Sequence, residues 1–392
     1  MHAFGKLIVA ATLALPAFVV SGDTLGAATN AAGQPTEQTA QQVGTEEATA
    51  ATVTAANPST VIGRAASWYV KVHVTGMNLA STDVLTVADP KGTELYRYSG
   101  NPAKERAAGD SPATPSDTGF WAMSVTGDTA VVTLRAKDGG APSALSSARI
   151  DKITRGFTDA EFTARTDAQT RSICGTNDYK DAVCYKTSNP TEFAKTAPVA
   201  KLLRNGSSLC TGWRVGANNR MLTNNHCFSS NPQQIEVWFN YQCETCGGTT
   251  SGTVTKVLAS EVLSTDYGLD YTLFSVTDFA KVQPFGSLEL DPRVPDVGEQ
   301  MYVVGHPAGK IKKVSLKDDQ SPSGNCQVGS VKVDGRVKES DIGYKCDTEG
   351  GSSGSPVLSA KTHKVISLHH YGGCPNQGVR IDLVHEKIKS QL

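Results

Sequence analysis

The sequence lacks an excess of charge of either sign. Its 392 residues include 37 Lys and Arg against 38 Asp and Glu, a formal net charge of -1. Domains that bind nucleic acid or anionic membrane surfaces usually carry a basic patch and a basic excess. We therefore expect neither nucleic acid nor a membrane as a partner, and partners must be inferred from a site.

Beyond its first residues, the sequence also lacks an apolar run long enough to span a membrane. The run from Leu7 to Val20 is too short, follows Lys6 and precedes small residues, which is typical of a secretory signal peptide over residues 1–22. Cysteine is absent from the first 170 residues, and all nine cysteines come later. Export to an oxidising compartment favours disulfides among them, so we expect a secreted, extracellular protein.

Large apolar residues are nearly absent from residues 23–58, which are rich in Ala, Thr, Gln and Gly. Such a segment cannot bury a core, so we expect it to be disordered. Residues 59–140 differ, because short runs of strand-forming residues alternate with turn formers. They predict a small, sandwich-like all-β domain. A propeptide, a binding module and a structural appendage all stay open as its role, and we favour the propeptide.

Residues 141–171 form a polar connector, and residues 172–392 form the unit that holds every cysteine. Frequent short strand signals predict that this last unit is also all-β. Its tail alone is helical in pattern, with Asp382 placed to cap the helix. Cleavage of the connector would release the unit, and its basic residues offer processing points, among them Lys152, Arg155, Arg165 and Arg171.

The stretch Glu349–Pro356 concentrates small residues around two serines, as a tight turn that presents a nucleophile requires. With Ser352 as nucleophile it reads G-x-S-x-G, the elbow of an α/β-hydrolase, whose acid and histidine follow in that order. Asp382 and His385 are the only such pair downstream, and they are too close in sequence to come from separate loops. This register would make the protein an esterase.

With Ser353 as nucleophile the stretch reads G-x-S-G-S-P, which resembles the active-site serine motif of chymotrypsin-fold serine peptidases. That fold places histidine, aspartate and serine in this order along the chain. His226, in Thr-Asn-Asn-His-Cys, and Asp270, in Leu-Asp-Tyr-Thr-Leu, precede Ser353 in this order. The resemblance implies a double six-stranded β-barrel with a C-terminal helix over residues 172–392.

The resemblance also implies a role for each residue. Ser353 would attack the carbonyl, His226 would transfer the proton, and Asp270 would orient the imidazole. Asp266 is a second acid nearby, but we choose Asp270 because its strand looks buried and a buried carboxylate needs a partner. Backbone N–H groups of Gly351 and Ser353 would form the oxyanion hole.

The similarity is strongest to the secreted microbial lysyl and glutamyl endopeptidases. Its further motifs are NYQCETC, GHP and LHHYGGC. The pairing in the lysyl branch implies disulfides of Cys174 with Cys374, Cys184 with Cys246, and Cys210 with Cys227. If these form, Cys326 and Cys346 are expected to pair as well, which leaves Cys243 odd. Cys243-x-x-Cys246 could be half of a zinc site, but no second half lies at a fitting distance, so we expect no metal and no cofactor.

Three kinds of residue before the scissile bond stay open: a basic one, an acidic one, and one that is neither. Asp347 lies six residues before Ser353, where trypsin-like enzymes carry the carboxylate that binds Lys or Arg, and we favour this specificity. Glutamyl enzymes use a pocket histidine instead, and His369 or His370 could serve. The segment His370 to Gly372, which includes Tyr371, should pair with the substrate backbone.

The leading hypothesis is therefore a monomeric secreted serine endopeptidase, made as a zymogen, that acts on proteins or peptides. The main rival is an inactive binding protein with a peptidase fold.

Overall fold

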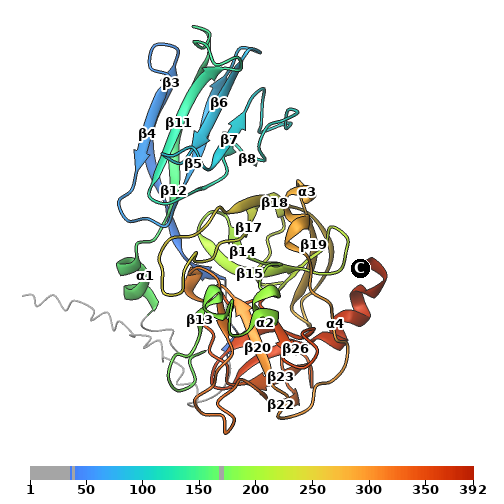
Figure 1. Ribbon diagram of the computed structural model, residues 1–392. Helices are drawn as coiled ribbons and strands as arrows, with labels where there is room; N and C mark the ends of the chain where they lie inside the picture. Colours follow the sequence, from blue (N-terminus) through green and yellow to red (C-terminus); the bar gives the residue numbers. More distant parts are fainter. Residues whose placement is uncertain (1–35, 38–39, 167–171) are drawn as a thin grey trace, which may run out of the picture. The chain divides into compact units, whose positions relative to one another are not determined.

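The structure, a computed structural model, describes residues 36–37, 40–166 and 172–392 (Figure 1). The predicted signal peptide, most of the segment predicted to be disordered before residue 40, and Arg171 lie outside these residues. Within the described part of the chain, no helix is both long and apolar enough to cross a membrane.

The first part of the chain is a sandwich of two antiparallel sheets (Figure 1). Strand β11 alternates between buried and half-buried residues along its whole length, which places one of its faces against the core. The larger sheet contains β3 (Gly44–Thr54), β12 (Ser147–Gly156), β5 (Tyr69–Asn78), β9 (Gly119–Trp121), β8 (Thr114–Ser116) and β10 (Val125–Thr126). The smaller sheet contains β4 (Ser59–Gly63), β11 (Thr129–Ala136), β6 (Asp83–Ala88) and β7 (Leu95–Tyr98).

The sandwich extends beyond the predicted boundaries of 59–140 at both ends. Strand β3 lies in the segment predicted to be disordered, and β12 lies in the predicted connector; the two pair along nearly their whole length. The reason is that β3, an edge strand, contributes mainly small side chains and backbone pairing with β12, so its composition lacks the large apolar residues by which a strand is predicted.

The peptidase-like part begins with a closed barrel of six strands, which β14 and β15 close by pairing with each other. Every residue of β17 and β19 is buried. The barrel strands are β14 (Val199–Arg204), β15 (Ser208–Arg214), β16 (Met221–Thr223), β17 (Ile235–Phe239), β18 (Thr255–Asp266) and β19 (Tyr271–Val276). A short strand, β2 (Gln41–Gln42), pairs with the first two residues of β15.

The last sheet curls into a half-barrel. Its strands are β13 (Lys180–Asp181), β20 (Met301–Gly305), β21 (Lys313–Ser315), β22 (Val328–Val333), β23 (Asp341–Tyr344), β24 (Pro356–Ser359), β25 (Val365–Gly372) and β26 (Asn376–Arg380). A two-residue strand, β1 (Thr36–Glu37), pairs with β25. The predicted all-β fold with two barrels after a small β domain is confirmed, although the second barrel is open.

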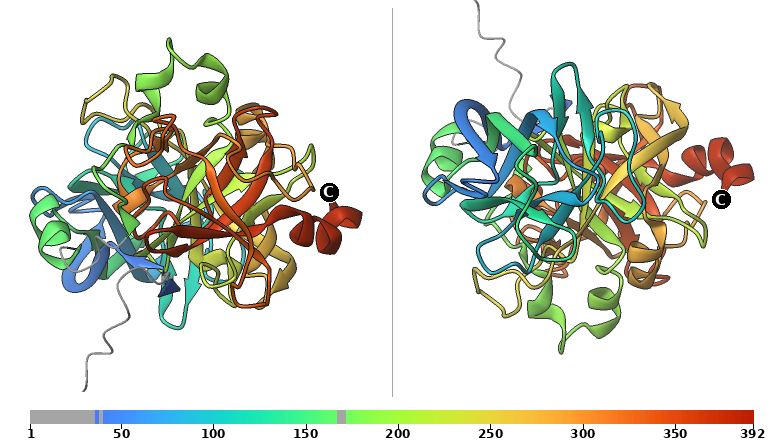
Figure 2. Two further views of the ribbon diagram at one scale, coloured as in Figure 1. Left: turned by 90° about the horizontal axis from the view of Figure 1, so that it is seen from below. Right: turned by 90° about the horizontal axis from the view of Figure 1, so that it is seen from above.

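Helices are short, and the C-terminal helix α4 (Ile381–Ile388) lies at the edge of the last sheet in both views of Figure 2. It buries Ile381, Val384 and Ile388, as the pattern predicts. Asp382 does not cap it; the cap position is Arg380, which pairs with Asp382 at 2.6 Å. The other α-helices are α1 (Asp159–Thr166), α2 (Pro190–Ala194) and α3 (Phe279–Val282).

Candidate active site

Strand pairing in the first barrel brings His226 to Asp270. Strands β16 and β19 pair with Thr223 opposite Thr272, so the short segment after β16, which includes His226, lies beside Asp270, the residue before β19. The imidazole Nδ1 of His226 is 2.7 Å from Oδ2 of Asp270, and the backbone N–H of His226 donates to Oδ1 at 3.1 Å. The carboxylate thus holds both the ring and the backbone of the histidine.

Asp270 is fully buried and has further partners. His370 Nδ1 lies 3.2 Å from Oδ2, and Arg336 Nη1 lies 3.0 Å from Oδ1. Burial by itself raises the pKa of the Asp270 carboxyl, but hydrogen bonds from His226 and His370 outweigh burial and hold this pKa well below its usual value. Asp270 is therefore ionised across the physiological pH range.

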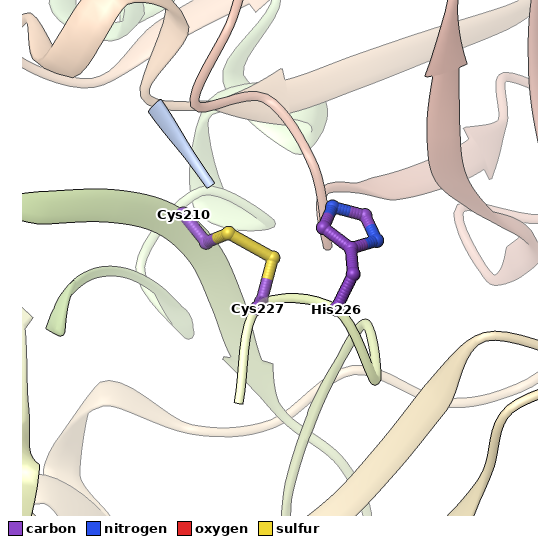
Figure 3. A group of neighbouring side chains, drawn as sticks. All are labelled: Cys210, His226 and Cys227. Atoms are coloured by element: carbon purple, nitrogen blue, oxygen red, sulfur yellow. A yellow bond between two sulfur atoms is a disulfide. The ribbon is translucent and has the colours of Figure 1, made fainter. Parts of the chain in front are cut away.

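A disulfide anchors the residue that follows His226. Figure 3 shows Cys210 joined to Cys227, with the imidazole of His226 beside the bridge. Ligand atoms of these three residues lie within 4.8 Å of one another, a spacing that suits a metal ion. However, both sulfurs are committed to the disulfide and so are not thiolate ligands. The group fits an anchor for the histidine better than a metal centre.

The loop that carries Ser353 is tied to both barrels. The N–H of Thr211 in β15 donates to the carbonyl of Ser353 at 2.8 Å, and the N–H of Gly354 donates to the carbonyl of His369 at 2.9 Å. Gly354 has φ +86°, and a Cβ there would lie 2.1 Å from the Thr211 carbonyl oxygen. Cys227 Sγ lies 3.7 Å from the Ser353 carbonyl, so the loop adjoins the histidine segment.

Gly351 also needs to be glycine. Its φ is +96°, and a Cβ would lie 2.7 Å from Leu209 Cδ2 and 2.9 Å from the carbonyl oxygen of His306. Its own carbonyl accepts from the Thr211 hydroxyl at 3.0 Å. The turn before Ser353 is therefore packed against β15 by its backbone.

Asp347 faces backbone donors. Its Oδ1 accepts from the N–H of Cys174 at 2.9 Å and its Oδ2 from the N–H of Asp178 at 2.6 Å. Burial raises the pKa of the Asp347 carboxyl to about 6, although these two hydrogen bonds oppose the shift. Both oxygens thus hold the start of the peptidase-like part in place.

The two pocket histidines lie in different surroundings, because successive side chains on β25 point to opposite faces. His370 bridges Asp270 and Asp341, whose Oδ2 is 2.6 Å from Nε2. His369 accepts or donates at Nδ1 with the Tyr344 hydroxyl at 2.6 Å, while its Nε2 has no hydrogen-bond partner among the described residues. Burial, with smaller contributions from His370 and His226, lowers the pKa of His369 to about 3.

Residues 210–368 match the family model described as the trypsin-like peptidase domain. Over these residues the chain is similar to that domain. Secreted RxLR effector protein 73 of Plasmopara viticola is 29% identical over 332 residues, which cover 79% of this chain and 76% of that protein. The inactive form of the Rv3671c protease of M. tuberculosis is 16% identical with a TM-score of 0.40, over 53% of this chain and 94% of that one. A serine endoprotease from Yersinia pestis is 13% identical with a TM-score of 0.39, over 52% of this chain and 66% of that one.

Four disulfides staple the peptidase domain, and they join the expected pairs: Cys174 with Cys374, Cys184 with Cys246, Cys210 with Cys227, and Cys326 with Cys346. Cys243 is a buried free thiol, whose Sγ lies 2.8 Å from the carbonyl oxygen of Gly248.

Three residues around the site were missed by sequence reasoning. Arg336 and Asp341 surround the His370–Asp270 contact, and Tyr344 touches His369. Nothing in the sequence around them marks a site. Tyr371 and Gly372 lie at the end of β25, and they are the residues that pair with β1.

Proposed function

We propose that the protein is a secreted serine endopeptidase, in which Ser353, His226 and Asp270 hydrolyse peptide bonds through an acyl-enzyme. The observation that carries this is the 2.7 Å contact of His226 with a buried, ionised Asp270, next to the strand that holds the carbonyl of Ser353. In this role Asp270 fixes the imidazole tautomer and stabilises the imidazolium. Gly351 and Ser353 would supply the oxyanion N–H groups.

Secretion is supported by the leader-like first residues and by four disulfides. The similar protein from Plasmopara viticola is itself named as secreted. The chain would thus fold in an oxidising compartment and act on proteins or peptides outside the cell.

Covalent labelling tests the catalytic assignment. A serine-directed phosphonofluoridate should form an adduct on Ser353 in wild-type protein, located by peptide mass spectrometry. Ser353→Ala should abolish labelling and hydrolysis, whereas Ser352→Ala, a matched change one residue away, should retain both. Label on Ser352 would instead favour an esterase, and no label would favour a binding protein.

For the residue before the scissile bond, the geometry favours an acidic or amide side chain over Lys or Arg. Both carboxylate oxygens of Asp347 already accept hydrogen bonds from backbone N–H groups. Both ring nitrogens of His370 already face carboxylates, those of Asp270 and Asp341. His369 remains, directly behind the serine loop, with Nε2 buried and unpaired among the described residues. Gln377 Oε1, on the neighbouring strand, is likewise buried without a partner there.

The imidazole N–H of His369 suits the oxygen of a substrate carboxylate or amide, and Gln377 Oε1 can accept from the NH₂ group of an amide. A peptide library read by mass spectrometry tests the choice. Cuts after Glu, Asp or Gln support His369 as the specificity residue. Cuts confined to Lys and Arg would overturn it and return the role to Asp347.

A further inference from the structure

One peptide unit in the serine turn is held by a loop from elsewhere in the peptidase-like part. The N–H of Ala308 donates to the carbonyl of Gly350 at 2.7 Å. This carbonyl belongs to the same peptide unit as the N–H of Gly351, one of the two proposed oxyanion donors. A trans peptide is planar, with its C=O and N–H on opposite sides. The hydrogen bond from Ala308 therefore fixes the direction in which the Gly351 N–H points.

The loop that contains Ala308 has an unusual backbone. Ala308 has φ +56°, in the left-handed region that residues other than glycine rarely adopt. Gly309 follows with φ +72°. A strained conformation of this kind persists only where the surroundings hold it. The loop from His306 to Lys310, called the supporting loop below, thus depends on its neighbours.

Some of these neighbours come from the sandwich. A Cβ at Gly309 would lie 3.0 Å from Val43 Cγ1 and 3.2 Å from Trp68 Cζ3, so both side chains lie against this glycine. Val43 and Trp68 directly precede the sandwich strands β3 and β5. Val43, Tyr69 and Ala308 share one buried apolar cluster, and Trp68 packs against it. The supporting loop therefore rests on the sandwich.

Lys201, fully buried in β14, holds the same loop through a hydrogen bond. Its Nζ donates to the carbonyl of Gly309 at 3.3 Å. The Nζ also lies over three aromatic rings, 4.4 Å from the centre of Tyr241, 4.7 Å from Trp238 and 5.8 Å from Tyr69. Burial lowers the pKa of Lys201 to about 7, and Nζ donates in either protonation state. Because Tyr69 belongs to the sandwich, both parts of the chain enclose this amine.

We propose that Trp68 and Lys201 are positioning residues for the oxyanion hole, and that the sandwich is a lasting part of the working enzyme. They hold the supporting loop, whose Ala308 N–H fixes the peptide that carries the Gly351 N–H. The proposal rests on the proposed function. It assigns the sandwich a role in catalysis, in place of a propeptide that is removed.

Buried ion pairs keep the sandwich attached, as this role requires. Glu236, buried in β17, pairs with Lys71 of the sandwich and accepts from the Ser124 hydroxyl at 2.5 Å. Lys256, also buried, pairs with Glu94 of the sandwich at 2.8 Å. Breaking such a pair leaves an uncompensated buried charge, so separation of the two parts is costly.

Two of the predicted processing points also do not suit removal of the sandwich. Lys152 and Arg155 lie in β12, which pairs with β3 on one side and β5 on the other. A cut at either residue would break an internal strand of the larger sheet. Cleavage there would damage the sandwich rather than release it.

Kinetics of the secreted full-length protein test the proposal, with the best substrate from the peptide library. Trp68→Ala removes the ring that lies against Gly309, and Lys201→Met removes the donor to its carbonyl. We expect kcat to fall about tenfold in each variant while KM stays within about twofold, because a displaced oxyanion donor weakens binding of the transition state more than binding of the substrate. Trp68→Phe keeps a ring at this position and should retain kcat within about threefold.

Trp121→Ala is the matched control. It removes a second half-buried tryptophan of the same sandwich, whose ring packs on His73 at 4.9 Å between ring centres. Its kcat and KM should stay within about twofold of wild type. Calorimetry of each variant reports whether the chain is folded.

A pair of inhibitors separates positioning from a general disturbance of the fold. With a peptide aldehyde, Ser353 Oγ adds to the aldehyde carbon, its proton passes to His226, and the former carbonyl oxygen becomes the anion that faces the Gly351 N–H. The matching peptide alcohol has no carbonyl and measures ordinary peptide binding. The inhibition constant of the aldehyde should rise about tenfold in Trp68→Ala and Lys201→Met, and that of the alcohol should stay within about twofold.

Unchanged kcat and unchanged aldehyde inhibition in Trp68→Ala and Lys201→Met would overturn the proposal and leave the peptidase standing. An equal rise for aldehyde and alcohol, or an equal loss of kcat in Trp121→Ala, would also overturn it, because either result indicates a general disturbance. If Trp68→Ala does not fold, Lys201→Met decides. Wild type that neither cleaves peptides nor labels at Ser353 overturns the proposed function, and the positioning roles with it.

Discussion

His370 Nε2 lies 2.6 Å from Asp341 Oδ2, and the other nitrogen of the same ring lies 3.2 Å from Asp270 Oδ2. A protonated imidazole donates from both nitrogens, whereas a neutral one donates from only one. Burial by itself lowers the pKa of His370, but its hydrogen bonds to Asp270 and Asp341 outweigh burial and raise this pKa to about 9. His370 is thus a buried cation that joins two buried carboxylates behind the proposed triad.

We expect Asp341→Asn to move the alkaline limit of activity. In wild type, kcat/KM should fall as pH rises through about 9, because His370 loses the proton that lets it bind both acids and Asp270 loses a donor. With Asn at 341 one of the two carboxylates is gone, and burial then lowers the pKa of His370. The alkaline limb should move down by about one pH unit or more, with kcat/KM at pH 6 within about threefold of wild type.

The control is Glu339→Gln, which removes an exposed carboxylate two residues away. Its pH–rate profile should overlay that of wild type. Equal alkaline limbs in Asp341→Asn and wild type would show that His370 does not support Asp270 through its charge.

The same histidine predicts how stability depends on pH. A pKa raised from 6.5 to about 9 on folding contributes stability that is complete below pH 6.5 and is lost as pH rises through 9. In an inactive Ser353→Ala background, unfolding free energy from denaturant titration should fall by up to roughly 3 kcal/mol between pH 6.5 and 10. Adding Asp341→Asn should flatten this fall. A free energy that rises over this range would contradict the assignment.

Asp347→Asn separates a structural role from a specificity role. An amide can accept from one of the two backbone N–H groups, but its own NH₂ then faces the other donor, at Cys174 or Asp178. We expect a loss of roughly 1–3 kcal/mol of unfolding free energy and an unchanged cleavage pattern in a peptide library. If Asp347 instead binds the substrate side chain, Asp347→Asn should leave the melting temperature unchanged and strongly reduce cleavage after Lys and Arg.

How much the sequence could predict depends on how local each signal is. His226 can be recognised from its neighbours, because Cys227 follows it and Cys210 lies upstream as a disulfide partner. Ser353 can be recognised because it lies in a run of small residues that is typical of a tight turn. The all-β class follows from short alternating runs. Asp341 and Arg336 have no such neighbours. Asp341 reaches His370 only because β23 packs beside β26, and Arg336 reaches Asp270 only because the turn after β22 folds back; both are contacts between distant segments.

The sandwich boundaries predicted from composition, 59 and 140, are too narrow for a related reason. Composition indicates strands that supply large apolar side chains, but it does not indicate a strand such as β3, which contributes mainly backbone pairing to the sheet. Residues 149–155, which include the predicted cleavage points Lys152 and Arg155, have the composition of a linker because most of them are Lys, Asp or Arg. In the fold these side chains lie on a paired strand, where Lys152 meets Glu46 and Arg155 meets Glu47.

Tyr344→Phe tests the proposed specificity pocket. The change removes the hydroxyl that lies 2.6 Å from His369 Nδ1 and leaves the ring in place. Without this partner the neutral imidazole loses its preferred tautomer and orientation, so the donor at Nε2 is no longer held toward the substrate. We expect kcat/KM on acidic or amide peptides to fall about tenfold, mainly through KM. Tyr302→Phe, a buried tyrosine on β20, is the matched control and should change kcat/KM less than threefold.

Glu236→Ala should uncouple the sandwich from the peptidase domain. The Glu236 carboxylate forms an ion pair with Lys71 and accepts hydrogen bonds from the Ser124 hydroxyl and the Trp238 indole N–H. All three partner residues are buried. Removal of the carboxylate leaves the Lys71 ammonium without its ion partner at a buried position, which typically costs about 3–5 kcal/mol. In calorimetry of the Ser353→Ala protein, we expect the unfolding midpoint to fall and two transitions to separate.

Glu46→Ala, which removes an exposed ion pair with Lys152 inside the sandwich, should shift the midpoint by at most a degree or two, since such pairs contribute about 0–1 kcal/mol. A single cooperative transition in Glu236→Ala, at the wild-type midpoint, would mean that this ionic network does not hold the sandwich in place, and that the sandwich could be lost on maturation after all.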